Sequence, residues 1–399
     1  MSALYGTYAR SDLAFERGEG VRLFTADGTS YLDFNSGIGV NALGHGDPHV
    51  VTALKAAADK VWHTSNIFTI PEQERLGQRL VDATFANAVF FTNSGAEAVE
   101  CAIKTARHYF FSLGQPDRYE IIAFTGSFHG RTLGTIAAGG NPHYIEGFGP
   151  PLPGFKHLAP GDLAAVEALV DDKTCAILIE PVQGEGGVTA MPVDFLKGLR
   201  EICDRHGMLL ILDEVQCGYG RTGKFFAYEW AGIEPDIMAV AKGIGGGFPL
   251  GACLARGEVA KSMVPGTHGS TYGGNPLACA VGNAVLDRIL GPGFLPEVEM
   301  KGQRLHWHLQ QLAQRFPNYV EEVRGKGLIA GLKITPPVRD FVARLRRDHR
   351  LLAVAAGENV LRLLPPLIIT EADIEEAMDK IAAAFTALDL EAATTPAID

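Results

Sequence analysis

Residues able to do chemistry stand at or shortly after the ends of five short apolar runs of the chain. The runs read AVFFT, EIIAF, CAILI, MLLIL and IMAVA, and the residues that follow them are Asn93-Ser94-Gly95-Ala96, Ser127-Phe128-His129-Gly130-Arg131, Glu180-Pro181-Val182-Gln183-Gly184-Glu185, Asp213-Glu214-Val215-Gln216 and Lys242-Gly243. Open α/β sheets bind ligands beyond the carboxyl ends of their strands. We therefore expect an anion site, an aromatic ring, several carboxylates and one lysine to meet at one edge of a sheet.

Lys242 offers the most specific chemistry of this set. It ends an apolar run and precedes a glycine-rich stretch, so its ammonium should be partly desolvated and its pKa lowered. Such a lysine suits Schiff-base chemistry with a carbonyl cofactor. Taken alone, a lysine at a strand end more often reaches solvent. Asp213, at the end of the neighbouring candidate strand, favours the first interpretation, because its carboxylate suits a protonated pyridine nitrogen.

Three further features fit a phosphate-bearing aromatic ligand. Ser94, Gly95 and Ala96 open a predicted helix, whose first N–H groups bind anions, although the same residues also make an ordinary N-cap. Phe128 could stack on a ring or belong to the core. Arg131 could hold a carboxylate in a bidentate pair or lie on the surface. The order of these features along the chain, more than any one of them, indicates a lysine–aldehyde cofactor site.

The elements that must position these residues form an α/β pattern. Short apolar runs separated by amphipathic segments predict parallel strands joined by helices. The predicted strands are Ala88–Thr92, Glu120–Phe124, Cys175–Ile179, Met208–Leu212 and Ile237–Ala241, and the clearest helices are Ala96–Phe110 and Pro192–His206. The glycine- and proline-rich stretch Gly139–Pro160 is expected to be a long loop.

The pattern changes after Asn275. It becomes helical through about Phe316 and continues as a shorter αβ stretch, with strands expected at Glu322–Arg324, Leu328–Leu332 and Val360–Leu364. We therefore expect an N-terminal segment (1–50) that packs with a small C-terminal domain (286–399), and a large ligand-binding domain between them (51–285).

Composition excludes several classes of protein. The formal net charge of −11 argues against nucleic-acid binding, and no apolar run is long enough to cross a membrane. The six cysteines show no C-x-x-C pair, so neither a metal site nor a disulfide framework is expected. The first residues lack the pattern of an export signal, and we expect a cytoplasmic protein.

Six sequence motifs together resemble the class III, fold type I aminotransferases. They are SGAEAVE, FTGSFHGRT, EPVQGEGG, LLILDEVQCGYGRTG, AVAKGIGGGFPLGA and HGSTYGGNP, and the similarity runs from GHGDPH near Gly44 to LRLLPP near Leu361. The resemblance implies pyridoxal 5'-phosphate as cofactor, and a homodimer with shared active sites. It also implies a large domain with a mostly parallel central sheet flanked by helices, plus a smaller α/β C-terminal domain. Within the class the chain looks most similar to the acetylornithine aminotransferases of arginine biosynthesis.

The resemblance also implies a role for each site residue. Lys242 would hold the cofactor as a Schiff base and move protons, while Asp213 would pair with the pyridine nitrogen. The remaining cofactor contacts would come from Gly95, Ala96, Phe128, Glu214, Val215, Gln216 and, from the partner subunit, Thr271. Substrates would meet Arg131 and Ser270. Arg362 would bind the α-carboxylate of glutamate or 2-oxoglutarate, with Glu185 pairing with it and swinging away.

The implied reaction is ping-pong transfer of the δ-amino group of N2-acetylornithine to 2-oxoglutarate. Relatives that use free ornithine carry a tyrosine where this chain has Ile38, which weakens that alternative. The chain is shorter than typical 4-aminobutyrate aminotransferases, which argues mildly against 4-aminobutyrate as substrate. Succinylornithine and N-succinyldiaminopimelate stay open as alternative substrates. A dinucleotide-binding dehydrogenase is suggested only by the string Gly218–Gly223 (GYGRTG), which lacks the expected helix and acidic strand end.

Overall fold

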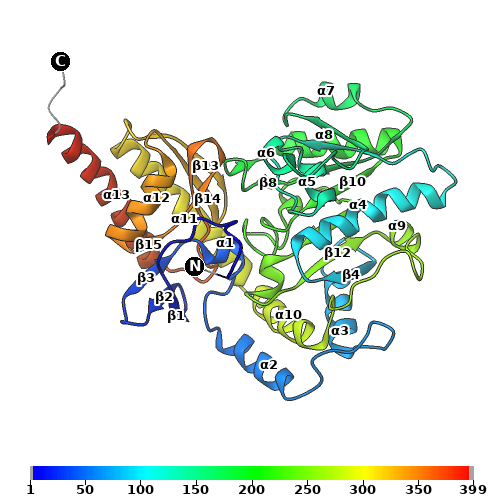
Figure 1. Ribbon diagram of the computed structural model, residues 1–399, viewed down its shortest axis with the longest axis horizontal. Helices are drawn as coiled ribbons and strands as arrows, with labels where there is room; N and C mark the ends of the chain where they lie inside the picture. Colours follow the sequence, from blue (N-terminus) through cyan, green and yellow to red (C-terminus); the bar gives the residue numbers. More distant parts are fainter. Residues whose placement is uncertain (1–2, 395–399) are drawn as a thin grey trace.

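A seven-stranded sheet forms the centre of the larger part of the molecule. The structure, a computed structural model, describes residues 3–394. In spatial order the strands are β4 (Ala88–Thr92), β12 (Gly251–Ala255), β11 (Ile237–Val240), β10 (Leu209–Asp213), β7 (Thr174–Ile179), β5 (Glu120–Phe124) and β6 (Phe155–Leu158). All neighbours pair in parallel except β12, which is antiparallel to both β11 and β4. The predicted α/β fold with a mostly parallel sheet is confirmed (Figure 1).

Alternate residues of each central strand enter cores on opposite faces of this sheet. Leu210 and Leu212 of β10 belong to one apolar cluster, and Leu209 and Ile211 belong to the other. The first cluster contains α8 (Val193–His206) and the second contains α4 (Gly95–Ser112). Burial on both faces explains why the strands read as continuous apolar runs.

The stretch predicted as a loop, Gly139–Pro160, is only partly a loop. It contains the short helix α6 (Pro142–Ile145) and the edge strand β6, which pairs with β5. β12 was not predicted at all. Most of its residues are small, and a Cβ on Gly251 would lie 2.6 Å from Thr92 Oγ1. The close contact with β4 therefore requires small side chains, and these give the strand only a weak apolar pattern in the sequence.

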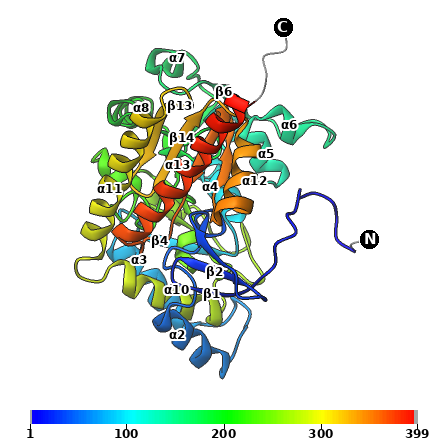
Figure 2. The same ribbon diagram turned by 90° about the vertical axis from the view of Figure 1, so that its left-hand side faces the viewer.

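A second, antiparallel sheet is formed by the last third of the chain. Its strands lie in the order β13 (Val320–Lys326), β14 (Ile329–Ile334), β17 (Val360–Leu363) and β16 (Val354–Ala356). Figure 2 shows α11 (Phe294–Arg315), α13 (Glu371–Thr394) and α12 (Val338–His349) beside this sheet. The strands expected near Glu322, Leu328 and Val360 therefore exist.

The N-terminal segment pairs with the C-terminal third. β1 (Phe15–Glu19), β2 (Arg22–Thr25) and β3 (Ser30–Asp33) form antiparallel ribbons, and β3 pairs in parallel with β15 (Leu351–Leu352). The N–H of Leu364 donates to the carbonyl of Phe34 over 2.7 Å. The boundaries at residues 50 and 285 stay predictions.

The other elements connect or cover these sheets. They are α1 (Ser36–Gly39), α2 (Pro48–Ala58), α3 (Pro71–Asp82), α5 (Leu133–Gly139), α7 (Leu163–Ala168), α9 (Gly257–Lys261), α10 (Pro276–Ile289) and the ribbon of β8 (Val182–Gln183) with β9 (Thr189–Ala190). Across residues 3–394, no helix has both the length and the apolar character needed to cross a bilayer. All six cysteines are buried free thiols.

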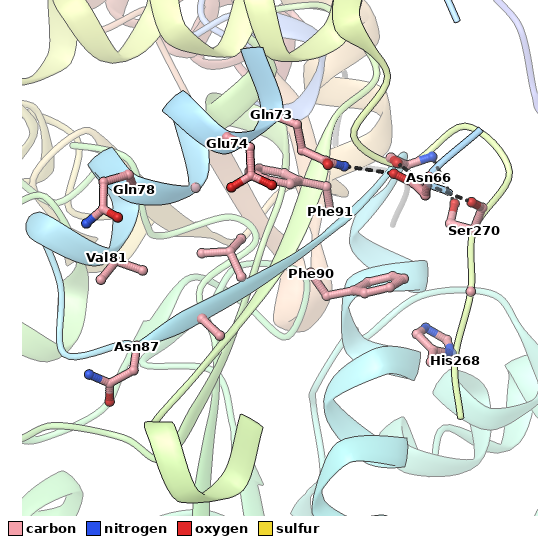
Figure 3. Close-up of a pocket in the computed structure, with 15 residues that line it drawn as sticks. Asn66, Gln73, Glu74, Gln78, Val81, Asn87, Phe90, Phe91, His268 and Ser270 are labelled. Carbon is pink, nitrogen blue, oxygen red and sulfur yellow. Dashed lines mark hydrogen bonds between the residues drawn. The ribbon is translucent and has the colours of Figure 1, made fainter. Parts of the chain in front are cut away.

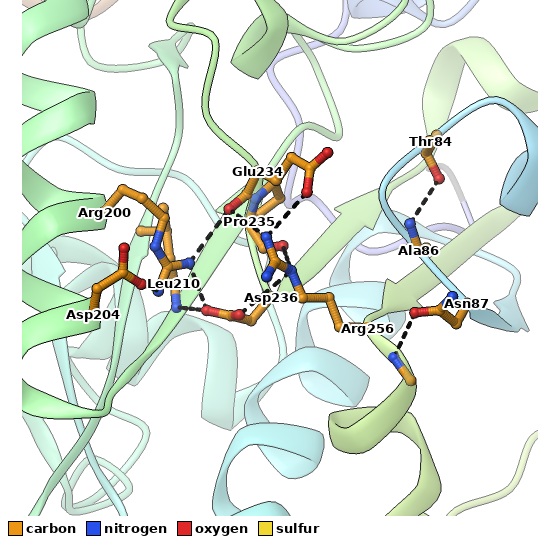
Figure 4. A network of polar contacts seen from close by, with 11 residues as sticks. Thr84, Ala86, Asn87, Arg200, Asp204, Leu210, Glu234, Pro235, Asp236 and Arg256 are labelled. Carbon is orange, nitrogen blue, oxygen red and sulfur yellow. Dashed lines mark hydrogen bonds and ion pairs between the residues drawn. The ribbon is translucent and has the colours of Figure 1, made fainter.

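Asp236 fixes the amino ends of the central strands. Its carboxylate accepts from Arg200 Nη1 at 2.6 Å and from the Leu210 N–H at 2.8 Å (Figure 4). Arg256, just after β12, lies 3.6 Å from its other oxygen. One carboxylate thus joins β10, β11 and β12 at the edge opposite to the one where the strand-end chemistry lies.

Candidate active site

A cavity of about 1070 Å³ opens at the carboxyl ends of the central strands. Every one of the five strand ends singled out in the sequence contributes to its lining. The contributing residues include Asn93, Ser94, Gly95, Ala96, Phe128, Arg131, Glu180, Glu185, Asp213, Val215, Gln216 and Lys242. The topology explains this convergence, since β4, β5, β7, β10 and β11 all run in the same direction.

Lys242 lies just after the end of β11, and its left-handed backbone (φ 50°) turns the chain away from the sheet. Burial lowers the pKa of its amine to about 8, helped by the charge of Arg362 and opposed by Asp213, Glu180 and Glu185. Within the described chain the amine has no hydrogen-bond or ion-pair partner, although it lines the cavity. A partly neutral, unpartnered amine facing a cavity is a nucleophile ready for a carbonyl.

Asp213 is buried at 3% exposure and is held from two sides. The Val215 N–H donates to Oδ1 at 3.0 Å, and His129 Nδ1 lies 2.8 Å from Oδ2. Burial acts to lower the His129 pKa, but the hydrogen bond and charge of Asp213, together with Glu180, outweigh it and raise that pKa. His129 Nε2 is buried without a hydrogen-bond partner among residues 3–394. Asp213 is a predicted site residue, whereas the role of His129 has no signal in the sequence.

Glu180 is a second buried carboxylate that the sequence analysis left without a role. Its Oε1 accepts from the Phe128 N–H at 2.7 Å and so fixes the backbone that carries the aromatic ring. Burial, followed by the charge of Asp213, raises the Glu180 pKa to about 7. Two carboxylates in one buried site are expected to push one pKa upward.

The start of α4 lines one end of the cavity. Ser94 caps the helix by accepting from the Glu97 N–H at 3.3 Å, which leaves the first-turn amides of Gly95 and Ala96 without acceptors inside the helix. A Cβ on Gly95 would lie 2.6 Å from Val215 Cγ1, so the approach of the helix to the loop after β10 requires glycine here.

Arg362 and Glu185 form an ion pair beside the cavity. Arg362, on β17, is buried at 1% exposure, and its Nη2 lies 2.9 Å from Glu185 Oε2. Its Nη1 also donates to Gln216 Oε1 at 3.3 Å. Glu185 lines the cavity whereas Arg362 does not, so the carboxylate covers the guanidinium.

Arg131 presents its guanidinium to the cavity from an aromatic support. The guanidinium carbon lies 3.7 Å from the centroid of Tyr144 and 5.5 Å from that of Phe128. Both rings and Ile38 line the same cavity. Tyr144 was not singled out in the sequence, because it lies on α6 inside the stretch predicted as a loop.

Besides Arg362, three predicted residues lie outside this cavity. The Glu214 carboxylate points into the core, where it accepts from the N–H groups of Ala227 and Tyr228 at 2.8 Å each. Ser270 lines a separate cavity of about 460 Å³ (Figure 3), and its hydroxyl accepts from the Gly273 N–H at 2.9 Å. Thr271 is exposed beside it, and its predicted role concerns the site of a partner subunit.

The residues present fit pyridoxal 5'-phosphate. Lys242 offers an unpartnered amine for an aldehyde, and Asp213 offers a buried carboxylate for a pyridine nitrogen. Gly95 and Ala96 offer free helix N–H groups for a phosphate. Phe128 lies between these groups along the chain and lines the same cavity.

The chain belongs to the class-III aminotransferases, whose family model matches residues 7–385. It is thus a transaminase that depends on pyridoxal phosphate. It is 59% identical over 382 residues to an acetylornithine aminotransferase of Mesorhizobium japonicum (96% of each chain), and 57% identical over 387 residues to that of Brucella melitensis (97% of this chain and 96% of the relative).

Solved structures agree with the fold. An ornithine aminotransferase from Toxoplasma gondii superimposes with a TM-score of 0.93 at 30% identity, covering 98% of this chain and 94% of that one. An N-acetylornithine aminotransferase from Stenotrophomonas maltophilia gives a TM-score of 0.84 at 36% identity, covering 96% and 98%.

Proposed function

We propose that this aminotransferase transfers the δ-amino group of N2-acetyl-L-ornithine to 2-oxoglutarate. The products are N-acetyl-L-glutamate 5-semialdehyde and L-glutamate, formed in two half-reactions at one site. The single observation that carries the proposal is that the site has two different guanidinium groups. Arg131 forms no ion pair within residues 3–394 and lines the cavity, whereas Arg362 is covered by Glu185. Relatives named for this activity, with 52–59% identity over nearly the whole chain, support it.

Pyridoxal phosphate, when bound, supplies the aldehyde that receives the amino group and a ring that withdraws electrons from the reacting carbon. Lys242 would hold it and carry the proton between substrate and cofactor carbons. A pKa of about 8 leaves a useful fraction of its amine neutral near neutral pH. Asp213 would keep a proton on the ring nitrogen, and His129 would orient Asp213 through the 2.8 Å contact.

The cofactor phosphate would be bound by Gly95 and Ala96 at the start of α4, and its ring would stack on Phe128. Gln216 and Val215 would complete the cavity on the side of β10. Glu214 supports this segment from behind, through the hydrogen bonds that bind it to Ala227 and Tyr228.

The two substrates would use different arginines. Arg131 would bind the α-carboxylate of the acylated donor, because its guanidinium has no ion-pair partner within residues 3–394. Ile38, 42% exposed at the cavity wall, offers no polar group to a free α-amine and so suits an acylated one. Glutamate or 2-oxoglutarate would need Glu185 to move aside before Arg362 could bind its α-carboxylate.

We also infer a cytoplasmic homodimer with shared active sites. Ser270 and Thr271 lie outside the cavity of their own chain, which is consistent with service to a partner's site. Large exposed apolar side chains stand on neighbouring parts of the chain, among them Trp62, Phe68 and Tyr272. Six buried free thiols suit a reducing compartment. Light scattering of the purified protein should give twice the chain mass of 42.7 kDa.

The substrate is tested by single-turnover conversion of the cofactor to its amine form. N2-acetylornithine should react faster than ornithine, 4-aminobutyrate, succinylornithine and N-succinyldiaminopimelate. Equal or slower conversion with acetylornithine would overturn the assignment. Lys242→Ala should reduce turnover by on the order of a thousandfold or more and remove the borohydride-sensitive yellow colour. A colourless wild-type protein without bound cofactor would refute the whole mechanism.

A further inference from the structure

The guanidinium of Arg131 rests on the face of Tyr144. The guanidinium carbon is 3.7 Å from the ring centroid, well inside the range of a cation–π contact. The Phe128 ring is more distant from Arg131, at 5.5 Å, and meets Tyr144 edge-on at 5.9 Å and 87°. Tyr144 is therefore the main support of a side chain that is otherwise exposed and unpaired within the described chain.

The position of Tyr144 is fixed by the corner that the chain makes between α5 and α6. Helix α5 ends at Gly139 and is followed by Gly140, whose positive φ of 63° turns the chain; a Cβ on Gly140 would lie 2.6 Å from the His157 ring. His157 in turn lies 3.0 Å from the carbonyl of Ala138, which ties the corner to β6. Asn141 then caps α6 by accepting from the His143 N–H at 3.0 Å. The corner thus holds Tyr144 next to the cavity, although α6 itself is short.

We propose that Tyr144 is a positioning residue that holds Arg131 ready for the α-carboxylate of the amino donor; this rests on the proposed function. A long arginine side chain loses rotamer freedom when it binds a carboxylate, and a ring that already restricts it lowers that cost. The stack leaves the guanidinium edge, which carries the N–H donors, free for the carboxylate.

The face of the Tyr144 ring, and not its hydroxyl, restricts the Arg131 side chain. Within residues 3–394, the Tyr144 hydroxyl takes part in no hydrogen bond, whereas the face contacts Arg131. Tyr144→Phe should therefore preserve function, and Tyr144→Ala should lose it. Within the described residues Arg131 forms no ion pair with a carboxylate, so no charged group would hold the guanidinium in place of the Tyr144 ring.

The experiment compares the two variants with the wild-type holoenzyme in single-turnover half-reactions. Tyr144→Ala should raise the half-saturating concentration of N2-acetylornithine about tenfold, with a much smaller change in the limiting rate. Tyr144→Phe should stay within about twofold of wild type. The half-reaction with glutamate, which uses Arg362, should be unchanged in both variants. Phe111→Ala removes an exposed aromatic ring outside the cavity and serves as the matched control.

An amino donor that lacks the α-carboxylate distinguishes positioning of Arg131 by Tyr144 from direct packing of the Tyr144 ring against the substrate. N-Acetylputrescine keeps the acyl group and the ω-amine of N2-acetylornithine but lacks the group that Arg131 would bind. Tyr144→Ala and wild type should have the same half-saturating concentration for it. An equal loss with both donors would show that the ring packs against the substrate and would overturn the inference, as would no loss with either.

Failure of the proposed function is distinguishable from failure of this inference. If wild type prefers another carboxylate-bearing donor, acetylornithine is the wrong substrate, and the same variants are compared with that donor and its decarboxylated analogue. Circular dichroism and cofactor content of Tyr144→Ala should match wild type. If they do not, Tyr144→Leu, which retains apolar bulk without a ring face, replaces it in the comparison.

Discussion

The lowered pKa of Lys242 predicts a specific pH dependence for cofactor uptake. Only the neutral amine attacks the cofactor aldehyde. With a pKa of about 8 in place of the ordinary 10.5, about 10% of the amine is neutral at pH 7 instead of about 0.03%, roughly a 300-fold gain. Uptake of pyridoxal phosphate by the apoenzyme, followed by visible absorbance, should therefore accelerate with pH and level off above a midpoint near pH 8.

Removing the charge of Arg362 tests why the Lys242 pKa is lowered. Burial is the main reason for the shift, and Arg362 is the next. Arg362→Met removes the cation and leaves the Glu185 carboxylate unpaired, so the midpoint should move to higher pH. Arg362→Lys keeps the charge and should leave the midpoint near that of wild type. A wild-type midpoint above pH 10, or a downward move in Arg362→Met, would refute the reasoning.

Three further predictions concern the stability of the fold and the shape of the cavity. Burial raises the Glu214 pKa to about 7, so its stabilising protonated form is fully present below about pH 4.5 and lost as pH rises through 7. Between pH 5 and 8 the unfolding free energy of the wild-type apoprotein in urea should fall by about 2.5 kcal/mol more than that of Glu214→Gln; parallel curves would contradict this. Asp236→Asn weakens the pair with Arg200 and should lower stability by about 1–3 kcal/mol, seen as a lower Tm, and an unchanged Tm would count against the network. Gly95→Ala places a Cβ 2.6 Å from Val215 Cγ1 and should weaken cofactor affinity; the added change Val215→Ala should restore it, and a failure to do so would locate the defect elsewhere.

The predictable part of the site came from strand direction. Once the apolar runs are read as parallel strands, Asp213 and Lys242 must end at the same edge, and the structure brings both into one cavity. The pattern of charges and glycines after the strands then limits the chemistry. The strands themselves could be predicted because a sheet buried on both faces leaves a clear apolar pattern in the sequence.

The missed residues depend on turns that the sequence pattern does not specify. His129 and Phe128 are neighbours in a segment without regular secondary structure, and only the three-dimensional structure shows that His129 lies 2.8 Å from Asp213. Tyr144 reaches Arg131 only because Gly140 packs against His157 at the corner before α6. The Phe128 N–H donates to Glu180 and so links the segments that follow β5 and β7; a contact between residues so distant in the sequence has no local signature.

The pairing of the N-terminal segment with the last third of the chain has a consequence for biosynthesis. The Ser36 hydroxyl donates to the carbonyl of Leu364, 328 residues further along, and the Leu364 N–H donates back to Phe34. Gly37 and Ile38, which directly follow Ser36, are part of the cavity wall. On the ribosome, a nascent chain therefore completes its seven-stranded sheet long before this wall has anything to dock against. We expect the newly made protein to acquire its cofactor only after release, when the segment around Leu364 can hold this part of the cavity wall in place.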